Sequence, residues 1–448
     1  MSLRKRVWGI GLALVLFVSV GTASLTAQSS SVGLAGGLGT EVINGVTYQT
    51  LSILPDLPIG PVGLGIDLSF HFRFYTPEQT DFGFYPRVED FWDSTATIQE
   101  NLSKWSSRIA YLRFGVKGDP INLVLGTLPS VTLANGFILG SYSNGMLQPV
   151  QKFTGLVANF DGSLFQFPYV GVETFTDNIS SFDLVGLRVY VKPFGLLLPD
   201  LALLKDMQVG VTTVVDTNPH QYSNPTESSP GTVMVSGLDT SLPLLGGPLV
   251  SAMAFGDFAL QNGHSGATVG LGGTVLGVVN WSVQNLFLGE NFVPTYFSKT
   301  YDLSRDTEYV YYNSKATSPI PATLAWQASL GANLLDTVSF GASLGGPYGN
   351  TVGATPTKYE LPKLESYFTI GQNPILPVTI DAYYNKDKLT SISELLSPQN
   401  AVIGARIGYV IGGTTITMVY SLRYIENATD PNKLWETTSK LETAIKLF

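Results

Sequence analysis

The chain has 448 residues, a formal net charge of −9 and no cysteine, and only 13% of its residues are charged. This acidic balance argues against nucleic acid as a partner, since phosphate binding needs a concentrated basic surface. The lack of cysteine excludes disulfides, thiolate metal sites and acylation of an amino-terminal cysteine.

The first 27 residues have the pattern of a secretion signal. Basic residues at positions 4–6 precede the apolar run Val7–Val20, and small residues follow. This order is typical of a cleaved signal peptide, and the run is short for a membrane helix, which needs about 20 residues. We expect cleavage between Ala23 and Ala27, and export of the mature chain.

Residues 28–61 allow two interpretations. Residues 42–46 have the pattern of a hairpin turn, with Asn44 and Gly45 at its centre. The segment therefore either adds two strands to the following sheet or folds inside it as a plug.

The stretch Val62–Tyr75 alternates strictly between apolar and polar or small residues. One face carries Leu64, Leu68 and Phe70, and the other carries His71 and further polar or small residues. Successive side chains of a strand point to opposite faces. The stretch is longer than the usual strand of a soluble protein, which has about 5–6 residues. It is long enough to cross a bilayer, for which a tilted strand needs roughly 9–11 residues.

The same alternation recurs along the chain and predicts an all-β fold. It is found at 110–117, 185–192, 324–331, 338–344, 378–385, 403–409 and 415–424, and more weakly at 121–127, 206–216 and 232–240. From residue 62 onward, short turns alternate with long loops, near 76–107, 128–151, 217–231, 289–320, 346–360 and 387–400. Residues 62–448 therefore predict a closed antiparallel transmembrane β-barrel of about 18 strands (range 14–20), with short periplasmic turns and long extracellular loops.

With these strands, the signal peptide and the terminal Phe448, the chain resembles the porin-type outer-membrane barrels of bacteria. The resemblance implies a bacterial outer-membrane location, contact with outer-membrane lipid and with the barrel-assembly machinery, and small solutes as cargo. One departure is that Phe448 is in phase with the charged face of the last strand. The mature length is also compatible with fatty-acid carriers of the FadL type, but residues 28–61 lack their Asn-Pro-Ala stretch.

The inward faces of these strands supply the candidate pore-lining residues. They are Asp67, His71, Arg73, Arg113, Lys117, Arg188, Lys192, Asp381, Arg406 and Arg423. Basic residues outnumber the inward acids, which are Asp67, Glu365 and Asp381. A basic wall favours an anion pathway, unless these cations pair with acidic loop residues folded inside.

Two loops offer means of narrowing such a pore. Residues 76–107 hold several acids and an amphipathic stretch, Ile98, Leu102 and Trp105, which fits either an inward loop or a surface helix. Residues 289–320 are rich in Tyr and Phe, which either guide flat solutes or pack a loop.

No pattern in the sequence favours an enzyme. His71 shares a strand face with Asp67 and Ser69, but three neighbours on one strand do not make a catalytic triad. No phosphate loop or metal-binding His pair occurs, and no cofactor is expected.

We expect a channel for passive diffusion of small hydrophilic solutes. The alternatives are a plugged carrier of hydrophobic compounds and a surface-exposed adhesin or structural barrel. Association of several copies is left open.

Overall fold

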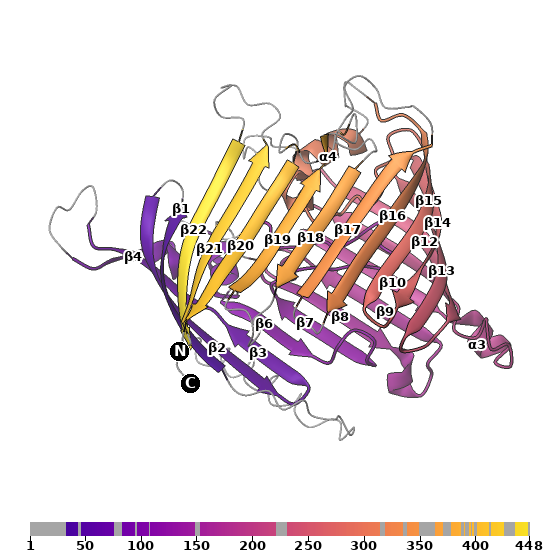
Figure 1. Ribbon diagram of the computed structural model, residues 1–448, viewed down its shortest axis with the longest axis horizontal. Coiled ribbons are helices and arrows are strands. Elements are labelled where there is room, and N and C mark those ends of the chain that lie inside the picture. Colours follow the sequence, from indigo (N-terminus) through magenta and orange to yellow (C-terminus); the bar gives the residue numbers. More distant parts are fainter. Residues whose placement is uncertain are drawn as a thin grey trace.

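A computed structural model describes residues 33–446, apart from 44–45, 76–82, 95, 107, 148–152, 221–230, 314–318, 335–337, 349–362, 371–377, 387–388, 390–393, 396, 398–400, 412–413 and 425–434. The signal peptide expected at 1–27 and the terminal Phe448 lie outside this range. The described strands form one large antiparallel sheet of 22 elements, which confirms the all-β class (Figure 1). In this part of the chain no helix is long and apolar enough to span a membrane.

The first eleven strands are β1 Gly33–Ile43, β2 Val46–Ile59, β3 Val62–Ile66, β4 Leu68–Arg73, β5 Tyr85–Pro86, β6 Ile109–Phe114, β7 Ile121–Gly126, β8 Gly155–Asp161, β9 Val170–Thr176, β10 Leu184–Val191 and β11 Gln208–Asp216. The others are β12 Val233–Leu245, β13 Val250–Gln261, β14 His264–Val275, β15 Val279–Leu288, β16 Thr323–Leu334, β17 Val338–Pro347, β18 Lys363–Ile370, β19 Val378–Lys386, β20 Ala401–Ile411, β21 Thr414–Tyr424 and β22 Trp435–Lys446. The helices are α2 Ile98–Ser106, α3 Pro193–Leu197 and α4 Arg305–Tyr312, and the 3₁₀ turns are η2 Val88–Asp90, η3 Gly162–Phe165 and η4 Tyr301–Leu303.

Neighbours along the chain pair in order, and the pairing returns to its starting strand. Strand β2 pairs with β1 on one side and with β3 and β4 on the other, and β3 pairs with β6. From β6 onward each strand pairs with the next. Strand β22 then pairs with β1, where Gly37 lies opposite Ala444. Residues 33–59, expected as extra strands or a plug, thus form strands of the sheet.

The two faces of the sheet differ in burial, as strand β10 illustrates. Arg188 and Tyr190 are 4% and 9% exposed, whereas Leu187, Val189 and Val191 are 47%, 44% and 42% exposed. We call the face of Arg188 and Tyr190 the inner face and the opposite one the outer face. The alternation expected for 185–192 is thereby confirmed, with apolar side chains on the exposed face.

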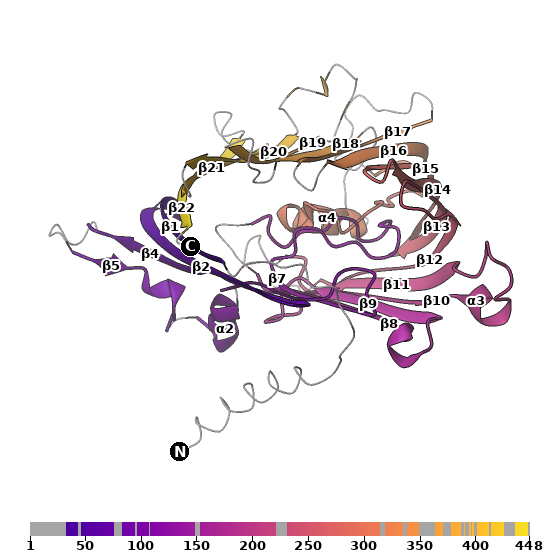
Figure 2. The same ribbon diagram turned by 60° about the horizontal axis from the view of Figure 1, so that its bottom comes forward.

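The main buried core lies against the inner face and not between two sheets. Residues 128–142, the first inner segment, and residues 292–312, the second inner segment, supply most of its large side chains. Figure 2 shows both segments, α4 included, enclosed by the strands. The prediction that 128–151 is an outer loop is therefore wrong for its first half, because its apolar side chains find partners only on the inner side.

Candidate functional site

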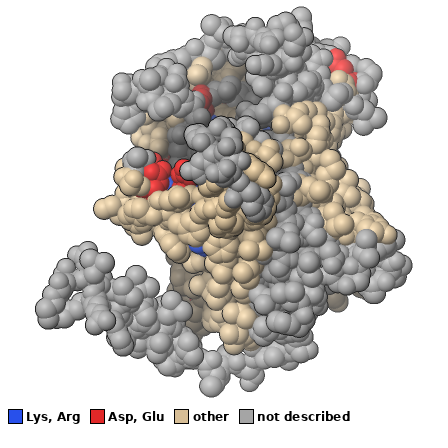
Figure 3. Space-filling model, turned by 90° about the vertical axis from the view of Figure 1, so that its left-hand side faces the viewer, with Lys and Arg blue, Asp and Glu red and all other residues tan. Residues whose placement is uncertain are grey.

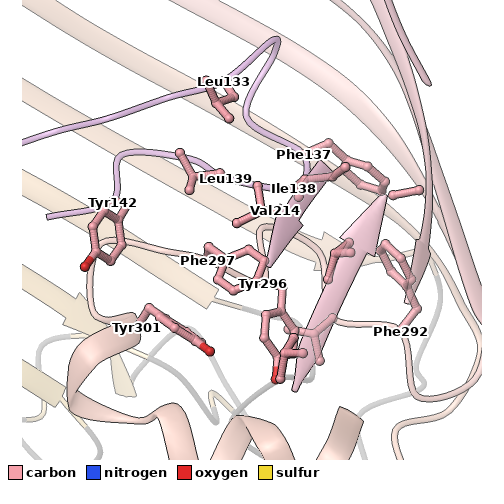
Figure 4. Close-up of a cluster of buried hydrophobic side chains, with 14 of the residues drawn as sticks. Leu133, Phe137, Ile138, Leu139, Tyr142, Val214, Phe292, Tyr296, Phe297 and Tyr301 are labelled. Carbon is pink, nitrogen blue, oxygen red and sulfur yellow. The ribbon is translucent and has the colours of Figure 1, made fainter. Parts of the chain in front are cut away.

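The two inner segments hold each other by apolar packing and by backbone hydrogen bonds. Phe137 stacks on Phe292, with ring centroids 5.5 Å apart, and Figure 4 shows these rings beside Tyr296 and Phe297. The amide of Phe297 donates to the carbonyl of Ile138 at 3.1 Å. The aromatic residues expected at 289–320 thus pack a core, the less specific of the two interpretations given for them.

A buried arginine fastens the second inner segment to the sheet. The guanidinium of Arg305, in α4, lies 2.9 Å from Asp177, 3.2 Å from Asp216 and 2.8 Å from Asp302. All four side chains are at most 2% exposed. Asp216 ends β11 and Asp177 directly follows β9, so the cluster joins α4 to two strands.

Two tyrosines complete this cluster. Tyr142 of the first inner segment donates to Asp302 at 3.0 Å, and Tyr301 donates to Asp216 at 2.7 Å. Burial raises the pKa of Tyr301 well above its ordinary value, so its hydroxyl stays a donor. Burial also raises the pKa of Asp177 to about 7, although the charge of Arg305 acts in the opposite direction. The protonation of Asp177, and with it the charge balance of the cluster, is therefore sensitive to pH near neutrality.

Arg188, a predicted pore-lining residue, belongs to a second buried cluster. Its guanidinium lies 2.6 Å from Asp239 of β12 and 3.4 Å from Glu173 of β9. The hydroxyl of Thr212 donates to Asp239 at 2.9 Å. Arg188 is thus matched by acids of neighbouring strands and does not add a free positive charge to the inner wall.

The sequence reasoning missed these two acids. Glu173 alternates with Val172 and Thr174, and Asp239 with Leu238 and Thr240. The alternation of both strands carries the signal that could have placed them on the inner face. It was weak because threonine and serine occupy outer positions as well.

The inner wall of β15–β17 carries amide and hydroxyl groups. Gln284 donates to Gln327 at 2.6 Å, and Gln327 donates to Ser343 at 2.7 Å. Ser343 also accepts a hydrogen bond from Ser329 at 2.9 Å. These groups form a polar strip on the inner face.

The polar strip continues into tyrosines on the next strands. Tyr367 of β18 and Tyr383 of β19 lie opposite each other in the register. The ammonium group of Lys299, on the second inner segment, lies 5.4 Å from the ring centre of Tyr383. The second inner segment therefore reaches across to this wall.

Three predicted site residues lie together near β4. Asp67, in the break between β3 and β4, accepts a hydrogen bond from Ser69. The ring nitrogen Nδ1 of His71 lies 2.8 Å from Asp90, and the Arg73 guanidinium lies 5.0 Å from the ring centre of Tyr48. His71 therefore has an acidic partner in η2, and its role as a pore-lining residue stays a prediction.

Three further predicted residues lie at or beyond strand ends. The guanidinium of Arg113, in β6, lies 5.7 Å from the ring centre of Tyr111. Lys117 follows β6, and its ammonium group donates to the carbonyl of Thr132 in the first inner segment at 3.3 Å. Lys192 directly precedes α3.

The last three predicted residues lie on β19, β20 and β21. Asp381 of β19 and Arg406 of β20 are exposed and lie directly opposite each other in the register. Arg423 of β21 pairs with Val402, and its side chain lies outside the described part. Among the described residues no group of three His, Cys, Asp or Glu side chains could hold a metal ion.

No family model and no curated protein matches the chain. A BenF-like porin from Pseudomonas fluorescens Pf-5 is similar, with 9% identity and a TM-score of 0.31 over 93% of this chain and 98% of that one. OccD3 (OpdP) of Pseudomonas aeruginosa is similar as well, with 8% identity and a TM-score of 0.31 over 96% of this chain and 95% of that one. CdiB from Acinetobacter baumannii is also similar (8%, 0.26), and the chain covers 60% of its length. Porins are thus among the structures that the chain resembles. Identities and TM-scores this low carry no argument about the fold, which rests on the strand pairing itself.

Proposed function

We propose that the chain is a porin-like channel of a bacterial outer membrane for passive diffusion of small hydrophilic solutes. In this proposal the sheet is a closed transmembrane barrel of about 20 strands, if β3 and β4 count as one and the two-residue β5 is left out. The observation that carries the proposal is the opposite character of the two faces of the sheet.

The outer face has the character of a lipid-facing surface. Leu187, Val211, Leu238, Leu271 and Leu330, from five different strands, are between 45% and 56% exposed. In Figure 3 the described surface is mostly uncharged, and its acidic groups lie in the upper half. Strands β12 to β16 have 10–13 residues, enough for the roughly 9–11 that cross a bilayer.

The inner face has the character of a hydrophilic passage narrowed by protein. The inner segments cover the walls of β9–β13 and one end of β15 and β16 with a packed core. The rest of β15–β20 carries amides, hydroxyls, tyrosines and the exposed pair Asp381 and Arg406. Solutes would pass between the second inner segment and this polar wall. No cofactor and no chemical step are part of the proposal.

The buried clusters argue for weak ion selectivity. Arg188 and Arg305 each face at least two carboxylates, and Arg406 lies opposite Asp381. Two of the seven inward cations expected from the sequence, Arg188 and Arg406, thus face acids, so a strong anion preference is not part of the proposal.

The test is single-channel conductance of the refolded protein in a planar bilayer, combined with cysteine labelling. Because the natural chain has no cysteine, each variant carries a single thiol. Asp381→Cys places it on the inner face, and Ile407→Cys places it on the outer face, where the natural side chain is 49% exposed. We expect a charged methanethiosulfonate to reduce the current through the first variant and to leave the second unchanged.

Other results would change the assignment. Folded protein that carries no current would overturn the open channel and favour a plugged carrier or an adhesin. Block of the Ile407→Cys variant alone would reverse the assignment of the two faces.

A further inference from the structure

Helix α2 presents an apolar face that the described chain leaves more than half exposed. Ile98, Leu102 and Trp105 follow one another at spacings of four and three residues, which places them on one side of the helix. They are 73%, 58% and 52% exposed. Contiguous exposed apolar side chains of this kind mark an interaction surface.

Polar contacts fix the orientation of this helix. The carboxylate of Glu100 accepts a hydrogen bond from the amide of Thr97 at 2.6 Å, and the hydroxyl of Thr97 accepts one from the amide of Glu100 at 3.2 Å. This reciprocal pair is a capping box. Asn101, 1% exposed, donates to the carbonyl of Asp93 and accepts from its amide, both at 2.9 Å. The helix is therefore built without burying its apolar face.

The carboxyl end of α2 lies on the outer side of the sheet. The guanidinium of Arg108 lies 5.3 Å from the ring centre of Trp105 and 5.7 Å from that of Phe70. Phe70 pairs directly with Leu51, which is 39% exposed, whereas the adjacent Thr50 is 4% exposed. Phe70 thus belongs to the outer face, and Figure 2 shows α2 outside the strands.

The strands next to α2 are too short to cross a bilayer alone. Strands β6 and β7 have 6 residues each and β8 and β9 have 7, against the roughly 9–11 needed. Strands β13, β14 and β16 each have 12. The hydroxyl of Ser106, at the end of α2, lies 3.4 Å from that of Ser180, in the connection that follows β9. The helix is thus placed beyond the loop ends of the short strands.

We propose, resting on the proposed function, that α2 lies in the outer leaflet of the membrane and that lipid acyl chains cover Ile98, Leu102 and Trp105. The helix would supply the apolar height that the short strands lack on this side. Aromatic side chains are favoured at the boundary between acyl chains and headgroups. Two further aromatic residues before the helix fit this boundary, since Phe84 and Trp92 are 64% and 53% exposed.

The test is the accessibility of a nitroxide spin label in lipid vesicles. The label is attached to Leu102→Cys, to Leu238→Cys on the outer face of β12, and to Glu89→Cys, whose natural side chain is 57% exposed beside α2. We expect the label at 102 to collide often with oxygen, which dissolves in acyl chains, and rarely with a water-soluble nickel chelate. The label at 238 should behave in the same way, and the label at 89 should show the reverse.

Three other outcomes of the spin-label experiment would each contradict a different part of the proposal. If the label at 102 behaves like that at 89 while that at 238 is in lipid, the proposal for α2 is wrong and the proposed function stands. If the label at 238 also meets the nickel chelate, the membrane barrel itself is wrong. Spin–spin broadening at 102 would show that a second copy of the chain covers the helix, which also overturns the proposal.

Discussion

Arg188 and Asp239 form an ion pair across the inner face of β11, with the guanidinium and carboxylate 2.6 Å apart. The strand between them carries Gly210, and a Cβ added there would lie 2.7 Å from both carboxylate oxygens of Asp239. Gly210 pairs with Tyr190 on one side and with Asp239 on the other. The absence of a side chain at this position therefore makes room for the ion pair.

Gly210→Ala should destabilise the protein by displacing this pair. The added methyl group cannot fit without moving a buried carboxylate away from its guanidinium, at a cost of about 1–3 kcal/mol. Gly256→Ala is the matched control, because its nearest contact would be an ordinary 3.4 Å. Urea unfolding of the refolded protein, followed by Trp fluorescence, measures both. Equal unfolding midpoints for the two variants would contradict the steric argument.

Arg188→Met should lower the free energy of unfolding by more than the ion pair with Asp239 contributes to it. Removal of the guanidinium leaves Asp239 and Glu173 buried without their cation, which costs about 3–5 kcal/mol. The double variant Arg188→Met/Asp239→Asn should lose less free energy of unfolding than the two single variants together. The second substitution removes a buried carboxylate that has lost its cation. The same unfolding assay gives the three free energies. Additive losses would show that the residues do not act as a pair.

Arg305→Met should loosen the second inner segment without disrupting the pairing of the strands. Its guanidinium contacts three buried carboxylates, and these contacts join α4 to the strands. We expect larger and noisier single-channel currents than in the natural protein. Lys205→Met, an equal loss of charge at an exposed position between β10 and β11, is the control. Identical current traces for both variants would rule out a role of Arg305 in holding the constriction.

The docking of α4 should weaken as the pH rises towards neutrality. The folded pKa of Asp177, about 7, lies above its ordinary value of 3.8, so the folded state binds more protons between these two values. The contribution of Asp177 to stability is therefore greatest at low pH, falls as the pH rises through about 7, and is constant above that. Transitions to larger currents should accordingly be rarer at pH 5 than at pH 8. Asp177→Asn should reduce this difference, and an unchanged pH profile would contradict the assignment.

The strands were largely predictable because their pattern is local. The alternation around Arg188 and Val189 is visible in the sequence, and it assigns the two residues to opposite faces. Strands β7, β11 and β12 were also found, near the weaker stretches at 121–127, 206–216 and 232–240. The rules of strand geometry need only neighbours two residues apart.

The inner segments were not predictable in the same way. Residues 128–142 have no regular period, and their position depends on contacts with residues about 160 positions later, such as that between Tyr142 and Asp302. The partners of Arg188 likewise come from other strands, Glu173 in β9 and Asp239 in β12. A pattern read along one strand contains no information about the register of the next.

The cluster around Arg305 also has a consequence for the order of folding. Asp177 and Asp216 reach their positions only when β9, β10 and β11 are paired, and Arg305 meets them from beyond β15. Contacts between such distant parts of a chain form slowly, because closing long loops costs entropy before any contact is gained. We therefore expect β9, β10 and β11 to pair first, so that their inner face stays exposed to water until the second inner segment docks on it.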